Sequence, residues 1–372
     1  MITLGDIFRR YGPAYRKTAG ERIPLNQRAA MTAIERCRTE ALGGQLYTCP
    51  ACATTRYSYH SCRNRHCPTC QQDQGQLWLA KQQELLLPVP YFLVTFTLPS
   101  QLRALARQNQ RCIYTLLFRS SAMALQQVAA DPRFLGGQIG MVGVLQTWTR
   151  DLRYHPHIHY LVPAGALDPA GAQWLPAKGR FLVHVKPLAK LFRGKVRAGL
   201  QQLHLAGGLP DKMWSQPWVV DCRPVGSGQA ALKYLAPYIF RVALSNNRLV
   251  DVANDQVTFR YRVAATKKTT TCTLSAGSFI GRFLQHILPK GFVKVRYYGL
   301  FRPSNRRLLA QVRDMLCGEL LGCPVSAKAG VVVATAPAVH GPLAPPCPTC
   351  GAVMHLSATL LPTSRSPPRT RG

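Results

Sequence analysis

Acidic residues are scarce in this 372-residue sequence, in which 15 Asp and Glu stand against 47 Lys and Arg and the formal net charge is +32 at pH 7. Such a chain cannot balance its own positive charge, so we expect it to bind a polyanion, and nucleic acid is the usual one. The scarcity also disfavours a metal-dependent hydrolase that activates water, because that class of site generally needs several carboxylate ligands.

Long apolar runs are absent as well. No segment approaches the ~18 apolar residues of a membrane-spanning helix, and the first ten residues contain no signal-peptide apolar region. We therefore expect a cytoplasmic protein without a membrane partner. In that reducing compartment, the 13 cysteines are not expected to form disulfides, and clustered cysteines suggest metal binding.

Two Cys-x2-Cys pairs, separated by 14 residues, lie in the first fifth of the sequence. Four thiolates at this spacing can close a tetrahedron around Zn²⁺, and the ion then replaces a core that would be too small to fold unaided. The predicted zinc ligands are Cys49, Cys52, Cys67 and Cys70.

Further residues between these pairs leave alternatives open. His60, Cys62 and His66 could belong to a second site, replace one of the four ligands, or support them. The interleaved Arg63 and Arg65 favour contacts to phosphate. Near the other end of the sequence, Cys347-Pro-Thr-Cys350 is half of another zinc knuckle, for which no partner is evident from the spacing; the candidates are Cys317, Cys323, His340 and His355.

His157 and His159 lie two residues apart, with Ile158 between them and the strand-forming run 160–162 behind them. Because side chains alternate along a strand, both imidazoles would leave the same face while Ile158 packs into the core. Two neutral imidazoles on one face can clamp a divalent metal. Taken alone, the stretch is equally compatible with a half-buried strand that carries histidines on its outer face.

The surrounding segments predict a sheet with helices. Runs rich in β-branched and aromatic residues predict strands over 91–98, 140–148 and 181–185. An apolar face at helical spacing predicts one long helix from 102 to about 130. Segments 178–197 and 290–313 each contain seven basic residues and no acidic residue, which favours a phosphate-facing surface over a merely solvated one.

Tyr234 and Tyr238 lie four residues apart on a predicted helix that spans 230–241, so they project from the same face. A tyrosine pair at this spacing is most often part of a hydrophobic core. The alternative is a pair of nucleophiles, because a tyrosine hydroxyl can attack phosphorus and form a covalent ester.

The cysteine cluster, the histidine strand and the spaced tyrosines occur here in one chain and in this order. The combination resembles the rolling-circle transposases of bacterial insertion sequences, the two-tyrosine branch of the HUH single-strand endonucleases. Coverage runs from about residue 7 to residue 307. The matching segments are 57–68, 155–159, 234–238, 241–246 and 283–292.

The resemblance implies an α+β fold in which an N-terminal zinc-binding module is followed by an HUH-type antiparallel sheet flanked by helices, with the histidine strand central. It implies three parts: residues 1–88 form a helical lead-in with the zinc-binding domain, 89–310 the catalytic domain, and 311–372 a tail that contains cysteines and is partly disordered. The resemblance also implies a bacterial protein that is associated with the nucleoid.

The activity implied is metal-dependent cleavage and transfer of single-stranded DNA through 5′-phosphotyrosine intermediates, which moves an insertion sequence by a rolling-circle mechanism. Its partners are then transposon ends and target DNA. Tyr234 and Tyr238 would be the nucleophiles. His157 and His159 would bind Mg²⁺ or Mn²⁺, and Zn²⁺ would be structural.

Two departures from the family pattern bear on this assignment. Pro237 stands where the family usually has a basic residue, and Gln146 stands where histidine is common. The third ligand of the divalent metal is therefore open between Gln146 and His155. The residues expected to contact DNA are Arg63, Arg65, Lys233 and Arg241. The main alternative function is a zinc-containing DNA-binding regulator without catalytic activity.

Overall fold

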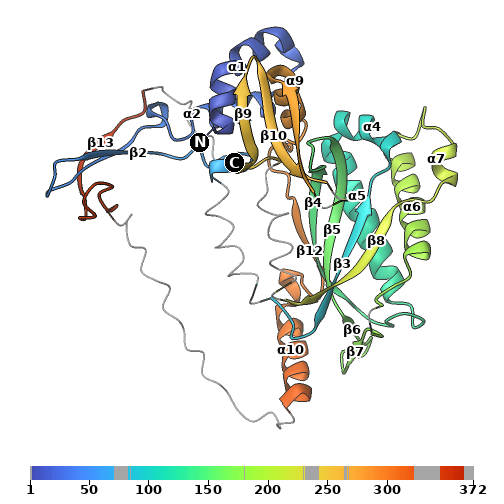
Figure 1. Ribbon diagram of the computed structural model, residues 1–372. Helices are drawn as coiled ribbons and strands as arrows, with labels where there is room; N and C mark the ends of the chain where they lie inside the picture. Colours follow the sequence, from blue (N-terminus) through green and yellow to red (C-terminus); the bar gives the residue numbers. More distant parts are fainter. Residues whose placement is uncertain are drawn as a thin grey trace.

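The computed structural model describes residues 2–70, 83, 85–179, 181–228, 230, 243–263, 266, 268–321 and 344–363. These residues form three parts that Figure 1 shows side by side: a central sheet with its helices, a helical body next to it, and a narrow β-ribbon that extends away from both. Within the described ranges, no helix is both long enough and apolar enough to cross a bilayer.

The central sheet has five strands in the order β12-β4-β5-β3-β8, and every neighbouring pair is antiparallel. The α+β class and the central place of the histidine strand, β5, are therefore confirmed. The strands are β3 (Pro90–Thr97), β4 (Gly140–Trp148), β5 (Tyr154–Pro163), β8 (Val220–Ser227) and β12 (Val295–Gly299).

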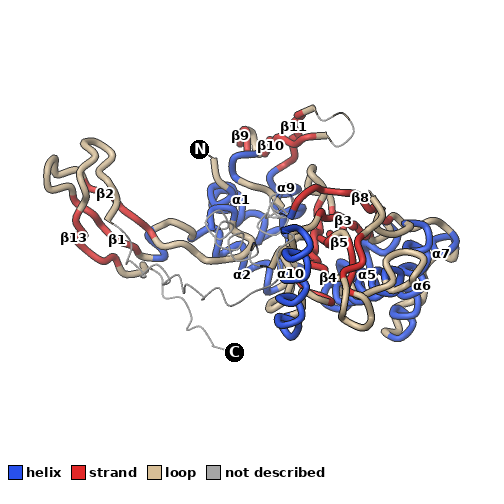
Figure 2. The backbone as a smooth tube through the Cα atoms, turned by 90° about the horizontal axis from the view of Figure 1, so that it is seen from below, coloured by secondary structure: helices blue, strands red, loops and turns tan. Residues whose placement is uncertain are grey.

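One face of this sheet is covered by α5 (Gln110–Ala129) and α6 (Val185–Gln202), which lie together beside the strands in Figures 1 and 2. The strands turn alternate apolar side chains toward these helices. Tyr160 of β5 and Phe96 of β3 meet edge to face, with ring centroids 5.8 Å apart. The Tyr160 hydroxyl also lies 2.8 Å from Ser121 Oγ. This face therefore forms the main hydrophobic core.

Two local predictions about this region need correction. The single helix expected over 102–130 is divided at Asn109, whose backbone (φ −121°, ψ 47°) is not helical, so α4 (Arg103–Gln108) precedes α5. The strand expected over 181–185 is absent, and that prediction was wrong. Leu182 and Val183 are buried without pairing to a strand, and α6 begins at Val185. The apolar side chains of this run therefore pack into the hydrophobic core, and its backbone forms no β-ladder.

On the opposite face of the sheet, α10 (Arg306–Leu321) packs Leu309 and Val312 near Val142 of β4 and Leu161 of β5. The histidines of β5 lie on this same face, because Leu161 and His159 are two residues apart on one strand. Two small elements complete this part: the hairpin β6 (Gly165–Leu167) and β7 (Trp174–Pro176), and the short α7 (Lys212–Ser215).

The helical body combines residues 2–36 with residues 243–287. Its elements are α1 (Leu4–Ala19), α2 (Leu25–Arg36), β9 (Leu249–Ala253), β10 (Gln256–Arg262), β11 (Thr269–Ser275) and α9 (Ala276–Leu284). Thr3 and Asp6 begin α1 with a reciprocal capping box. Phe8 of α1 then packs edge to face against Phe283 of α9, at 5.6 Å between centroids.

The third part, here called the terminal ribbon, consists of residues 44–59 and 344–360. Its three antiparallel strands are β13 (His355–Leu360), β1 (Gly44–Thr48) and β2 (Thr55–Tyr59), in that order. Figures 1 and 2 both show it projecting from the rest of the molecule. The expected division of the chain at residues 88 and 310 stays a prediction, although packing in the ribbon and in the helical body joins segments across it.

Candidate functional site

His157 and His159 leave the same face of β5, with ring centroids 4.8 Å apart and ring planes at 86°. Both side chains are buried, with only 8% and 7% of their surface exposed. The strand pairs with β4 on one side and β3 on the other, so two hydrogen-bonded ladders hold both histidines in place. The same-face geometry expected from the spacing is present.

Hydrogen bonds determine which ring nitrogen of His157 is available. Its Nδ1 lies 2.6 Å from the backbone oxygen of His155. A carbonyl oxygen can only accept, so Nδ1 bears the hydrogen and Nε2 retains a lone pair. For His159, Nδ1 lies 2.9 Å from Oγ1 of Thr95, the residue directly opposite on β3. If the hydroxyl accepts this hydrogen, Nε2 of His159 also retains its lone pair.

Burial keeps these imidazoles neutral. It lowers the pKa of His157 to about 4, and it also lowers the pKa of His159 well below its ordinary value, with the charge of Arg223 acting in the same direction. Near pH 7 both rings are therefore in the uncharged form that ligates metals.

Gln146 stands on β4 directly opposite His157, so its side chain shares the face of the histidines. Its Nε2 donates to the Trp148 backbone oxygen at 3.2 Å. Its Oε1 is buried and has no hydrogen-bond partner among the described residues. A buried oxygen without a partner is costly unless another group completes it. Two imidazoles and one amide oxygen on this face are donor types that a divalent metal accepts.

His155 lies on the same face, and its ring centroid is 5.2 Å from that of His157. Arg103 Nη2 donates to His155 Nδ1 at 2.7 Å, which occupies one ring nitrogen. Burial and the charges of Arg103 and Arg153 lower the pKa of His155. Arg103 also has a buried Nε without a partner in the described part of the chain.

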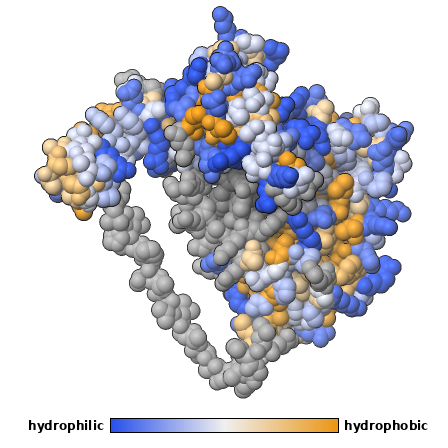
Figure 3. Space-filling model, viewed as in Figure 1, coloured by the Kyte–Doolittle hydropathy of each residue, from blue (hydrophilic) through white to orange (hydrophobic). Residues whose placement is uncertain are grey.

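Arg103 was not predicted from the sequence. Its only signal there is that a basic residue follows shortly after the strand predicted over 91–98. Figure 3 shows that hydrophilic side chains cover much of the face seen in Figure 1, as the basic composition requires.

The expected nucleophiles, Tyr234 and Tyr238, lie outside the described residues, as do Lys233 and Arg241. Their roles stay predictions. Of the other two residues expected to contact DNA, Arg63 is exposed. Arg65 is partly buried and donates to the Phe292 backbone oxygen at 2.6 Å, so its guanidinium joins the cysteine-rich loop, residues 60–70, to the segment after α9.

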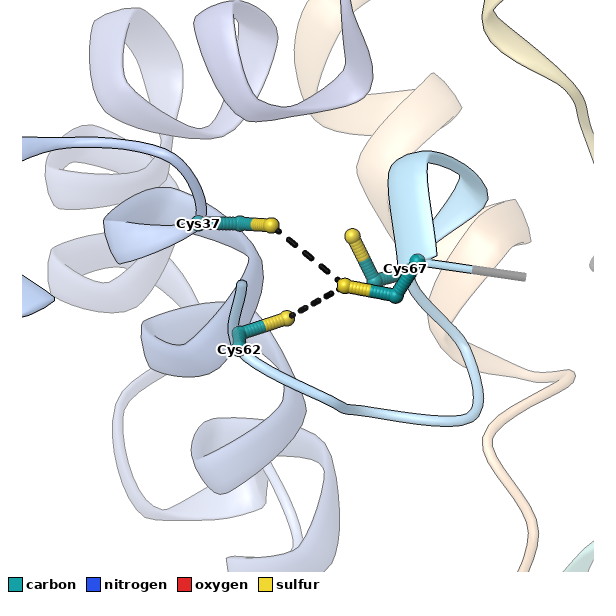
Figure 4. A group of neighbouring side chains, drawn as sticks. Cys37, Cys62 and Cys67 are labelled. Atoms are coloured by element: carbon teal, nitrogen blue, oxygen red, sulfur yellow. Dashed lines mark hydrogen bonds between the residues drawn. The ribbon is translucent and has the colours of Figure 1, made fainter. Parts of the chain in front are cut away.

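An inner cysteine cluster forms where the helical body meets this loop. Its members are Cys37, Cys62, Cys67 and Cys70, whose Sγ atoms all lie within 4.8 Å of one another. Figure 4 shows three of these side chains directed toward a common centre. Cys70 Sγ is 3.5 Å from Cys37 Sγ and 3.6 Å from Cys62 Sγ. Zn–S bonds of about 2.3 Å in a tetrahedron place sulfurs about 3.8 Å apart, so four thiolates here fit Zn²⁺.

The structure corrects the predicted grouping of the four zinc ligands. Cys67 and Cys70 belong to the inner cluster, whereas Cys49 and Cys52 lie in the terminal ribbon, in a second group with Cys347 and Cys350. The reason is that strand β2 lies between the two pairs. Its five residues extend about 16 Å, so Cys67 and Cys70 lie far from Cys49 and Cys52.

Of the surplus candidates, Cys62 is a member of the inner cluster, whereas His60 and His66 are not. Cys37 was missed as a ligand because it continues the apolar spacing of Ala30 and Ile34, which predicts a packed helix face over 27–42. It follows directly on the last residue of α2, which turns its thiol toward the loop.

Comparison with known proteins gives two family matches that together cover most of the described chain. A family model described as "Transposase zinc-binding domain" matches residues 7–98, and one described as "Putative transposase" matches residues 140–308. The inner cysteine cluster lies inside the first match and the histidine strand inside the second. Cys347 and Cys350 lie outside both.

Two curated proteins are similar over most of their length. "Putative transposase y4qJ" of Sinorhizobium fredii (strain NBRC 101917 / NGR234) is 42% identical over 336 residues, which cover 84% of each chain. The "Transposase for insertion sequence element IS801" of Pseudomonas savastanoi pv. phaseolicola is 29% identical over 314 residues, 78% of this chain and 71% of that protein. No solved structure matches this chain.

Proposed function

Because the chain belongs to the IS91-type family of rolling-circle transposases with an N-terminal zinc-binding domain, we propose that it cleaves and transfers single-stranded DNA with a divalent metal and tyrosine nucleophiles. The family resemblance expected from the sequence is thereby confirmed, and with it a DNA-processing activity. The metal, the nucleophiles and the single-stranded substrate are the proposal.

The arrangement of His157, His159 and Gln146 on one face carries this proposal. Two neutral imidazoles and a buried amide oxygen, which has no hydrogen-bond partner among the described residues, are arranged side by side on paired strands. Mg²⁺ or Mn²⁺ bound there would polarise a non-bridging phosphate oxygen. Gln146 is the proposed third ligand in preference to His155, since one ring nitrogen of His155 is already bonded to Arg103.

The other groups of the site suit a phosphodiester. Arg103, beside His155, offers a charged side chain at the edge of the proposed metal ligands, and its buried Nε–H has no partner within the part of the chain that the structure describes. Arginine is well matched to phosphate because its planar fork donates several hydrogen bonds at once. The large excess of basic residues supplies affinity for the DNA backbone without selecting sequence.

The bond changes are those of tyrosine-mediated phosphoryl transfer. The hydroxyl oxygen of Tyr234 or Tyr238 attacks phosphorus, the bond from phosphorus to the 3′-oxygen breaks, and the tyrosine proton ends on the released 3′-hydroxyl. The 5′-phosphotyrosine ester conserves the energy of the broken bond, so a later 3′-hydroxyl can displace the tyrosine without ATP. A second tyrosine permits a second cleavage before the first ester is resolved.

The double variant Tyr234→Phe/Tyr238→Phe tests this proposal. It keeps both rings and removes both attacking oxygens. With labelled single-stranded oligonucleotides that tile the ends of the insertion sequence, and with Mn²⁺ present, we expect the denaturation-resistant protein–DNA adduct to vanish while DNA binding persists. The matched control is Tyr57→Phe/Tyr59→Phe, two hydroxyls removed from strand β2 of the ribbon. An adduct that forms at the normal rate in the first variant would refute the proposal.

A further inference from the structure

A second group of four cysteines, here called the outer cysteine cluster, lies at the end of the terminal ribbon. It combines Cys49 and Cys52 with Cys347 and Cys350, so its two halves are about 300 residues apart in sequence. Cys49 Sγ is 3.4 Å from Cys350 Sγ, and Cys52 Sγ is 3.6 Å from Cys347 Sγ. The four sulfurs all lie within 4.8 Å of one another.

The first half of the cluster is a tight turn between β1 and β2. The backbone N–H of Cys49 donates to the Thr54 carbonyl oxygen at 2.9 Å, and the N–H of Ala53 donates back to the Cys49 carbonyl oxygen at 3.0 Å. Ala53 adopts a left-handed conformation with φ 55°. These contacts turn the chain so that both thiols of the Cys-x2-Cys pair face one way.

The second half repeats the same turn at the same positions. The N–H of Cys347 donates to the Ala352 carbonyl oxygen at 2.8 Å, and the N–H of Gly351 donates to the Cys347 carbonyl oxygen at 2.9 Å. Gly351, the counterpart of Ala53, is also left-handed, with φ 78°. Glycine takes this conformation at little cost. The sulfur contacts bring together two turns of one geometry, an arrangement typical of paired zinc knuckles.

A disulfide is a poorer account of these contacts. A disulfide requires sulfurs about 2.05 Å apart, and the two short separations here are 3.4 and 3.6 Å. Tetrahedral zinc expects about 3.8 Å between sulfurs. In addition, the backbone N–H of Thr349 donates to Cys347 Sγ at 3.4 Å, a contact that stabilises a sulfur carrying negative charge.

The hydrophobic core of the ribbon is too small to be its main source of stability. Its buried apolar cluster is limited to Tyr47, Cys49, Cys347 and Met354 among the residues that the structure describes. Three short strands over so small a core are marginal unless a metal or a disulfide holds them. Two of the four core residues are themselves cysteines of the cluster.

We propose that Cys49, Cys52, Cys347 and Cys350 bind a second Zn²⁺, which fastens residues 344–363 onto the N-terminal zinc-binding module. The family match for that module ends at residue 98, so it includes only half of these ligands. The proposal is independent of the DNA-cleavage chemistry, because no residue of the central sheet takes part in it.

Metal analysis of the full-length protein, purified without chelator, tests the proposal. We expect about two zinc ions per chain, one for each cluster. Cys347→Ser/Cys350→Ser and Cys49→Ser/Cys52→Ser should each lose one ion. The quadruple variant that combines them should lose the same single ion, because both pairs serve one site. Cys112→Ser, an exposed cysteine of α5 outside both clusters, is the control and should keep both ions.

A wild-type protein with a single zinc ion would overturn the proposal, and this result does not depend on whether any variant folds. So would a quadruple variant that loses twice as much metal as either pair. Cobalt substitution gives a second measurement. The thiolate-to-Co²⁺ absorption should fall by about half in Cys347→Ser/Cys350→Ser, and unchanged absorption would contradict a shared site.

Discussion

The central sheet and the cysteine clusters present their proposed metal ligands in opposite ways. His157 and His159 stand on one strand that is hydrogen-bonded on both sides, so their positions are set before any ion binds. The cysteines come from loops and helix ends that only meet in the folded chain. A preorganised pair of ligands favours catalysis, because no free energy is needed to reorganise the side chains when substrate binds. Ligands gathered from separate segments suit folding, because the ion itself holds the segments together.

The two cysteine clusters also differ from each other. Cys37, Cys67 and Cys70 of the inner cluster belong to the large hydrophobic core of the helical body, together with Phe8 and Phe283. The outer cluster has only the small ribbon core around it. Loss of the inner ion should therefore be felt throughout the helical body, whereas loss of the outer ion should be local.

The largest expected effect is that of Cys67→Ser. It removes one buried ligand and leaves three thiolates without their ion, so we expect the free energy of unfolding to fall by on the order of 5 kcal/mol. Cys350→Ser should change it by less than about 1 kcal/mol, while the β1 and β2 amides lose their protection from hydrogen exchange. Urea unfolding and hydrogen exchange measure the two effects. Equal global destabilisation by both variants would contradict the difference drawn between the clusters.

The next effect concerns the histidine face. We expect His157→Ala and His159→Ala each to slow covalent adduct formation at least about 100-fold, because the loss of bound metal removes several kcal/mol of transition-state stabilisation. Zinc content and DNA affinity should stay near wild type. His184→Ala, an exposed histidine at the start of α6, is the matched control. A parallel loss of zinc in these variants would mean that the strand and the clusters are not separate systems.

The smallest expected effect concerns the contact between the central sheet and the helical body that holds the inner cluster. His286, in the helical body, is buried; its Nδ1 lies 3.2 Å from Thr147 Oγ1 of β4, and its Nε2 lies 3.2 Å from the Leu152 carbonyl oxygen. Burial lowers its pKa from 6.5 to about 4. The stability that depends on neutral His286 is therefore present above pH 6.5 and is lost as the pH falls from 6.5 toward 4.

His286→Gln should flatten this dependence. Between pH 7 and pH 5 the wild-type protein should lose about 1–2 kcal/mol more unfolding free energy than the variant, because it must take up one more proton on unfolding. Urea unfolding at several pH values measures the difference. If the two curves run parallel, protonation of His286 does not control this contact.

The parts of the fold that were predictable are those specified by local pattern. The strands over 91–98 and 140–148 are apolar and β-branched on both faces, and the structure buries them on both faces. The histidine pair was predictable for the same reason, because period-two alternation is a property of the strand itself. The run at 181–185 failed because burial of Leu182 and Val183 does not require a ladder partner.

The cysteine pairing could not be read from spacing. Cys49 and Cys67 look like members of one site because the sequence shows only their separation, and it does not show that β2 carries the chain away between them. Cys37 was hidden by a helix pattern that explained it as an apolar residue. Gln146 was noticed only as a departure from a family pattern; the strand register that places it opposite His157 is a tertiary property.

The pairing of β13 with β1 has a consequence for the timing of synthesis. Strand β1 is made early, yet its second neighbour follows about 300 residues later. At roughly 5–20 residues per second, β1 waits on the order of tens of seconds with one edge unpaired. An open edge is a surface on which another strand can pair. Completion of the ribbon therefore marks a chain that has been translated through its last cysteine pair, and a chain cut short before residue 344 cannot assemble the ribbon.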